Sequence, residues 1–172
     1  WKIDMPLLSV LMFMEDKGIK IDRTKVQDYE RQLAHDLEQI SLPFNPFSTQ
    51  ELQSYVYGTL GIEPFRFTDS GAPSVDEEVL ETLDDPVIKK VLEYKRLRKE
   101  KDTYIDNYVN RVGLDGRIHP EFKQCSTATG RLSSANPNLQ NVPKTEMRKL
   151  FVAEEGKKIA RVDFIQIELC VF

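Results

Sequence analysis

The chain has 172 residues, a net charge of −4 and an apolar content of 40%, with 30% charged residues. This balance suffices for a folded core and is unlike that of a disordered chain. No apolar run approaches the roughly 20 residues that a membrane-spanning helix needs, so we expect no membrane span. Cys125 and Cys170 form neither a disulfide framework nor a metal-binding spacing, which is typical of a reducing intracellular compartment.

Two helices are predicted at the start of the chain. The first begins near Asp4 and Pro6 and ends at Gly18. Asp22 can cap the second, in which apolar residues recur every three or four positions over residues 26–40. This stripe predicts a helix that packs one face against a core.

Two short helices are predicted next, each from a capping box. Ser48 with Glu51 forms the first box, and Gly61 ends that helix. Ser74 with Glu77 forms the second. A loop rich in proline and glycine separates the two helices.

A long helix is predicted from Asp85 and Pro86 to about Val112, with its apolar residues facing inward. Seven basic and two acidic residues fall between Lys89 and Lys101, so this window has a net charge of +5 and the rest of the chain −9. A polyanionic partner and an ordinary solvated helix face both fit the window, and the sequence leaves both open.

The chain changes character after Gly113. Short strands are predicted at Ile118 and Phe122, and residues 123–148 are then nearly all polar, with no periodicity. Arginine, asparagine and glutamine side chains reach base edges, and small hydroxyl residues bind phosphate oxygens. The stretch is therefore either a nucleic-acid-binding loop or an ordinary hydrogen-bonded loop.

A last strand is predicted over residues 157–164, followed by a helix over residues 165–172. Asp163 lies at the end of this strand. A carboxylate in that place can bind a hard cation, or it can cap the following helix.

Two segments near the C-terminus resemble motifs of the family A DNA polymerases, the bacterial DNA polymerase I type. Residues 127–143 read TATGRLSSANPNLQNVP, and residues 162–169, VDFIQIEL, are similar to the first catalytic motif of the palm. The resemblance covers almost the whole chain. It implies a mainly α fold with a small α+β part: a lead-in helix over 1–20, a helical thumb over 21–112 and the N-terminal strands of the palm over 113–172.

The resemblance implies a DNA-directed DNA polymerase, which transfers a nucleotide to a primer 3′-hydroxyl by a two-metal mechanism with Mg²⁺. Asp163 would be a catalytic carboxylate and metal ligand, together with the backbone carbonyl of Phe164. Ile165, Gln166 and Glu168 would line the pocket for the incoming dNTP.

The resemblance also implies nine contacts with primer–template DNA. Thumb residues would bind phosphates, and residues of the polar stretch would hold the duplex or contact its minor groove. The thumb set is Asn45, Ser74, Lys99 and Lys101, and the second set is Arg131, Asn138, Gln140, Asn141 and Arg148.

Ile165 replaces a small serine of the family motif, and Cys170 replaces an arginine. The fingers and the second palm motif of the family have no counterpart in the sequence. We therefore expect an incomplete fragment that binds primer–template duplex, has the missing fingers and remaining palm as partners, and is inactive alone. The alternative is a non-catalytic duplex-DNA-binding module or a degenerate polymerase remnant.

Overall fold

The computed structural model describes residues 2 and 4–162. The chain divides into two compact units, one formed by Trp1–Lys25 with Asn110–Phe172 and the other by Val26–Val109. Helices dominate, with two small antiparallel sheets, so the predicted mainly α fold with a small α+β part is confirmed. Within the described residues, no helix is long and apolar enough to cross a bilayer.

The first unit begins with helix α1, Asp4–Lys17, which ends at Gly18 as predicted. Gly18 has a φ of +57°, and a Cβ there would lie 2.7 Å from the carbonyl oxygen of Ile118. Glycine is therefore needed for both the backbone conformation and the close approach. The tight turn leads into strand β1, Ile19–Lys20, which pairs antiparallel with β2, Arg117–Ile118.

The chain returns to β1 after a 3₁₀ helix, η3, Glu146–Leu150. The backbone N–H of Asp22 donates to the carbonyl of Leu150 at 2.9 Å, and that of Val152 donates to Lys20 at 3.1 Å. These bonds place residues 150–152 along β1.

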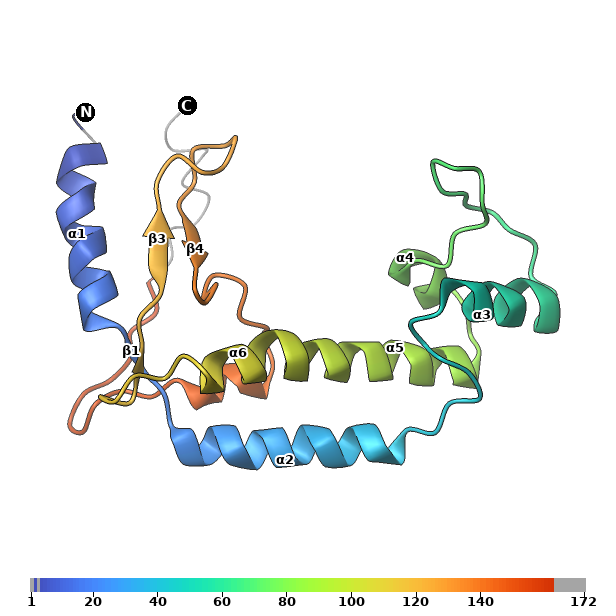
Figure 1. Ribbon diagram of the computed structural model, residues 1–172, viewed down its shortest axis with the longest axis horizontal. Helices are drawn as coiled ribbons and strands as arrows, with labels where there is room; N and C mark the ends of the chain where they lie inside the picture. Colours follow the sequence, from blue (N-terminus) through green and yellow to red (C-terminus); the bar gives the residue numbers. More distant parts are fainter. Residues whose placement is uncertain (1, 3, 163–172) are drawn as a thin grey trace. The chain divides into compact units, whose positions relative to one another are not determined.

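The second sheet of this unit spans the start of the predicted polar stretch and lies beside α1 (Figure 1). Strand β3, Glu121–Lys123, pairs antiparallel with β4, Ser133–Ala135. The Glu15 carboxylate of α1 accepts a hydrogen bond from the backbone N–H of Phe122. Strand β3 agrees with the expectation at Phe122, whereas β4 was not predicted.

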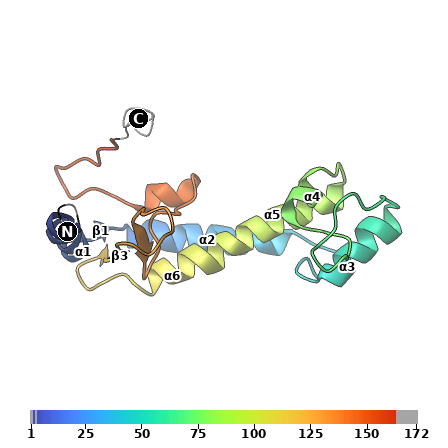
Figure 2. The same cartoon turned by 90° about the horizontal axis from the view of Figure 1, so that it is seen from above.

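The second unit is helical, and α2 lies along α5 in both views (Figures 1 and 2). Its elements are α2, Arg23–Gln39, whose first turn belongs to the other unit; α3, Thr49–Gln53; η1, Ser54–Thr59; α4, Glu77–Glu81; α5, Pro86–Lys99; η2, Glu100–Ile105; and α6, Asp106–Val109. One core cluster is formed by Leu52, Val56, Val75, Leu80, Ile88 and Val91. The predicted long helix is thus α5–η2–α6, with six residues in a π-helical turn and an end at Val109.

Side-chain caps define the helix starts in this unit. Ser48 caps α3 and Asp85 caps α5, as predicted. The capping box at Ser74 is wrong: Asp76 is the N-cap of α4, and its carboxylate accepts from the N–H of Val79 at 2.9 Å. Ser74 instead donates its hydroxyl to Asp76, so its side chain supports the cap.

The strand predicted over residues 157–164 is not seen in its described part, because residues 157–162 have no regular structure. Residues 163 and 164 of that prediction lie outside the described part of the chain.

Candidate nucleic-acid interface

Five of the seven basic residues of α5 and η2 are exposed, and the other two, Lys95 and Lys101, are half-buried. The apolar residues Ile88, Val91 and Leu97 of α5 are buried. Lys90, Arg96 and Lys99 are exposed, and among the residues described none of the three has an ion-pair partner. These three cations, which we call the open cations, are available to a polyanion.

Three other cations of the window are paired with acids. Lys89 pairs with Asp84, the Arg98 guanidinium lies 2.7 Å from a carboxylate oxygen of Asp102, and the Lys101 ammonium lies 3.3 Å from one of Asp106. The Lys101 side chain is only 23% exposed. The two predicted phosphate contacts therefore differ, because Lys99 is exposed whereas Lys101 is half-buried and paired.

One acid of the window faces away from the exposed surface. Glu100 is buried and accepts a hydrogen bond at 2.8 Å from the hydroxyl of Tyr29 on α2. Its carboxylate is therefore turned toward α2. Burial also lowers the pKa of Lys95, and the nearby Glu77 carboxylate opposes that shift.

The other two predicted thumb contacts have local structural bonds. Asn45 is exposed, and its side-chain oxygen accepts from the backbone N–H of Phe47 at 3.0 Å. Ser74 is 5% exposed, with its hydroxyl 2.9 Å from an Asp76 carboxylate oxygen. Of these two residues, Asn45 is exposed and Ser74 is buried. The phosphate contacts of both remain predictions.

The polar loop between β3 and β4 is held by backbone and side-chain hydrogen bonds. The Thr127 hydroxyl donates to the carbonyl of Arg131 at 2.8 Å, and the backbone N–H of Gly130 donates to Thr127 at 3.1 Å. The Gln140 amide donates to the carbonyl of Leu132 at 3.1 Å, which joins the loop to the segment after β4. The loop is ordered by these bonds.

The five predicted DNA contacts of this unit are all exposed: Arg131, Asn138, Gln140, Asn141 and Arg148. Besides Gln140, two of them form side-chain hydrogen bonds with the backbone. The Asn138 side-chain oxygen accepts from the N–H of Gln140 at 3.0 Å, and the Arg148 guanidinium donates to the carbonyls of Val142 and Pro143 at 3.2 Å each. All five predicted contacts therefore lie on the first unit.

Ser134 has a structural role that the sequence does not reveal. It is 5% exposed, and its hydroxyl donates to the carbonyl of Pro137 at 3.2 Å and accepts from the N–H of Leu139 at 3.3 Å. A run of small polar residues gives no signal of which hydroxyl faces inward.

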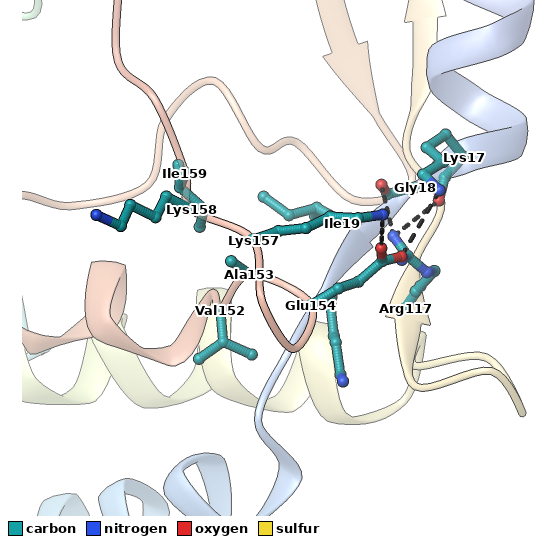
Figure 3. Close-up of a pocket in the computed structure, with 11 residues that line it drawn as sticks. Lys17, Gly18, Ile19, Arg117, Val152, Ala153, Glu154, Lys157, Lys158 and Ile159 are labelled. Atoms are coloured by element: carbon teal, nitrogen blue, oxygen red, sulfur yellow. Dashed lines mark hydrogen bonds and ion pairs between the residues drawn. The ribbon is translucent and has the colours of Figure 1, made fainter.

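A charged cavity of about 260 Å³ is lined by residues 17–20, 117, 152–154 and 157–159 (Figure 3). Lys17, Arg117 and Lys157 surround the Glu154 carboxylate; the Lys17 ammonium lies 3.6 Å from it, and the other two are hydrogen-bonded to it. The hydrogen bond from Lys157 and the nearby cations lower the pKa of Glu154. The sequence did not identify this cluster, because Lys17 and Arg117 are 100 positions apart in the chain.

The predicted metal and nucleotide site lies outside the described residues. This applies to Asp163, Phe164, Ile165, Gln166 and Glu168. Among the residues that are described, no group of three or more histidine, cysteine or acidic side chains is arranged to hold a metal ion.

The sequence model of DNA polymerase family A matches residues 19–172. The chain is 39% identical over 191 aligned residues to DNA polymerase I of Chloroflexus aurantiacus, with 99% of this chain and 20% of the relative covered. It is 35% identical over 187 residues to the thermostable DNA polymerase I of Thermus aquaticus, with 99% and 22% covered. The chain therefore spans about a fifth of the length of these relatives.

A solved structure shares the fold. It is the POL domain of Pol1 from M. smegmatis in complex with DNA primer-template and dNTP, with a TM-score of 0.77 and 31% sequence identity. The similarity covers 89% of this chain and 30% of that one.

Proposed function

Because the chain belongs to DNA polymerase family A, we propose that it serves template-directed DNA synthesis as the thumb and the first part of the palm of a DNA-directed DNA polymerase. The observation that carries this proposal is the structural similarity over 89% of the chain to a polymerase domain bound to primer-template and dNTP. The share of the relatives that the chain covers supports its assignment to part of such an enzyme.

In this proposal the open cations bind DNA phosphates. Lys90, Arg96 and Lys99 are exposed, and the nearby Glu100 faces the protein interior. Each phosphate contact releases condensed counterions, which makes binding favourable and salt-dependent. Phosphate contacts of this kind position a duplex without selecting a sequence.

The ordered polar loop and the segment after β4 contact the minor groove. There, purine N3 and pyrimidine O2 are hydrogen-bond acceptors shared by the correct base pairs. Side-chain donors at Arg131, Gln140 and Asn141 suit these acceptors, and the bonds within the loop reduce the conformational freedom lost on binding. The loop and the segment after β4 would thus check pair geometry and not base sequence.

Asp163 and the backbone carbonyl of Phe164 offer oxygen ligands, the kind that Mg²⁺ prefers. Two bound Mg²⁺ ions would supply activation of the primer 3′-hydroxyl and charge neutralisation at the triphosphate. Gln166 and Glu168 would line the nucleotide pocket. Glu154, nine positions before Asp163, pairs with Lys17 of α1 and Arg117 of β2. These ion pairs hold the backbone at Glu154 next to α1 and β2.

The preferred form of nucleic acid tests this proposal. Fluorescence anisotropy with labelled oligonucleotides of equal length should give tighter binding to a primer–template duplex than to single-stranded DNA. The Asn141→Ala variant should weaken duplex binding, and Asn107→Ala, an exposed asparagine of α6, is the matched control. Equal binding to both forms of DNA would contradict a primer–template function.

A further inference from the structure

Positive charge is concentrated in the cavity that contains Glu154 (Figure 3). Among the described residues, Glu154 is the one acid in its lining. The nine predicted DNA contacts and the open cations all lie outside this lining. Five cations line the cavity, which gives the lining a net charge of +4: Lys17, Lys20, Arg117, Lys157 and Lys158.

Three of these cations converge on a single carboxylate. The Lys17 ammonium lies 3.6 Å from Glu154, and Arg117 and Lys157 are hydrogen-bonded to it. Three positive charges around one negative charge leave an excess of +2 at this point. The other two cations, Lys20 and Lys158, have no ion-pair partner within the described part of the chain. The carboxylate of the chain itself therefore does not neutralise the cavity.

Hydrogen bonds order the backbone of the cavity before any ligand binds. Strand β1, with Lys20, pairs with β2, with Arg117. The N–H of Val152 donates to the carbonyl of Lys20 at 3.1 Å, and that of Lys157 donates to the carbonyl of Glu154 at 2.9 Å. A ligand in this cavity would therefore cost little backbone ordering.

We propose that this cavity binds a phosphate group. A multiply charged oxyanion matches the excess positive charge, and arginine and lysine side chains are the usual donors to phosphate oxygens. Apolar walls strengthen the attraction by excluding water, and the side chains that form them are Ile19, Val152, Ala153 and Ile159. The inference goes beyond the proposed polymerase function, because the cavity lies apart from every DNA contact proposed above.

Inorganic pyrophosphate is the probe, measured by isothermal titration calorimetry on the whole chain at constant ionic strength. EDTA in the buffer removes divalent metals, so that a metal-dependent site does not contribute. Pyrophosphate should bind, and citrate, a tricarboxylate, should bind more weakly.

Two variants with matched charge test the place of binding. Lys20→Ala/Lys158→Ala leaves the three pairs with Glu154 intact and should weaken pyrophosphate binding by about tenfold, or roughly threefold for each lost charge. The control is Lys123→Ala/Lys144→Ala, which replaces two exposed lysines of the same unit outside the cavity. It should bind pyrophosphate as the unchanged chain does.

The Glu154→Gln variant should change affinity in the opposite direction. It removes the negative charge from the lining and keeps a polar side chain of the same size, so pyrophosphate should bind about threefold more tightly. Circular dichroism melting shows whether this variant folds. If it does not, the two lysine variants decide the test.

A competition titration identifies where the phosphate comes from. Single-stranded oligothymidylate should displace pyrophosphate if the cavity takes a nucleic-acid phosphate, and should leave it bound if the ligand is a free polyphosphate; both results support a phosphate site. Four results would overturn it: no binding of pyrophosphate, equal binding of citrate, equal losses in the two lysine variants, or weaker binding by a folded Glu154→Gln variant.

Discussion

His119 shows how one residue links the end of α1 to the turn before β2. Its ring Nδ1 lies 2.8 Å from the carbonyl oxygen of Glu15, and its Nε2 lies 3.1 Å from a carboxylate oxygen of Asp115. Both partners are acceptors, so the protonated ring can donate to both. The hydrogen bond to Glu15 and the charges of Asp115 and Asp16 raise the pKa of His119 above 6.5, despite some burial.

A raised pKa in the folded state means that the added stability is fully present below pH 6.5 and is lost as the pH rises through the folded-state value. We expect the free energy of unfolding, measured in urea, to decrease as the pH rises through the folded-state pKa of His119. The His119→Gln variant should lack this decrease. His35→Gln, which replaces the other histidine, is the control and should keep it. A pH profile that His119→Gln leaves unchanged would contradict the assignment.

For single residues, the sequence predicted the polar stretch, but it did not predict which side chains are buried or ion-paired. The polar stretch predicted a loop, and Arg131, Gln140 and Asn141 of that stretch are exposed. The burial of Ser74 could not be predicted, because it depends on Asp76 being the N-cap of α4. Which cations remain open depends on neighbouring acids whose pairing is set by helix geometry.

At the scale of elements, α5 depends on its cap. The Asp85 carboxylate accepts from the backbone N–H groups of Val87 and Ile88 at 2.9 Å each. Asp85→Ala should lower the free energy of unfolding by about 1 kcal/mol. Asp84→Ala removes the adjacent carboxylate, which is 91% exposed, and should cost less in the same urea titrations. Equal losses in the two variants would show that the cap does not stabilise the helix.

Strong local signals predicted the helices, and weak ones left the sheets uncertain. Asp85 followed by Pro86, and Ser48 followed by Glu51, fix helix starts through nearby atoms. Strand β4 consists of Ser133–Ala135, which has no apolar alternation, and it forms because β3 supplies its hydrogen-bond partners. The π-helical turn at Glu100–Ile105 likewise follows no local pattern in the sequence.

At the scale of the whole molecule, each unit has its own part in the proposed function. One carries the open cations, and the other carries the polar loop and the segment leading to Asp163. The division itself depends on long-range pairing, such as Ile19 with Ile118, which local propensities cannot specify. The two C-terminal motifs predicted membership of DNA polymerase family A, and the family match confirms that prediction.

The salt dependence of duplex binding tests the central claim most directly. The logarithm of the association constant should fall linearly with the logarithm of NaCl concentration, by about 0.9 per phosphate contact. Replacing Lys90, Arg96 and Lys99 by alanine should reduce that slope by up to about 2.7. The charge-matched control replaces Lys2, Lys25 and Arg31, and its slope should stay the same as that of the unchanged chain. A flat salt response, or an equal reduction in both triple variants, would contradict the account.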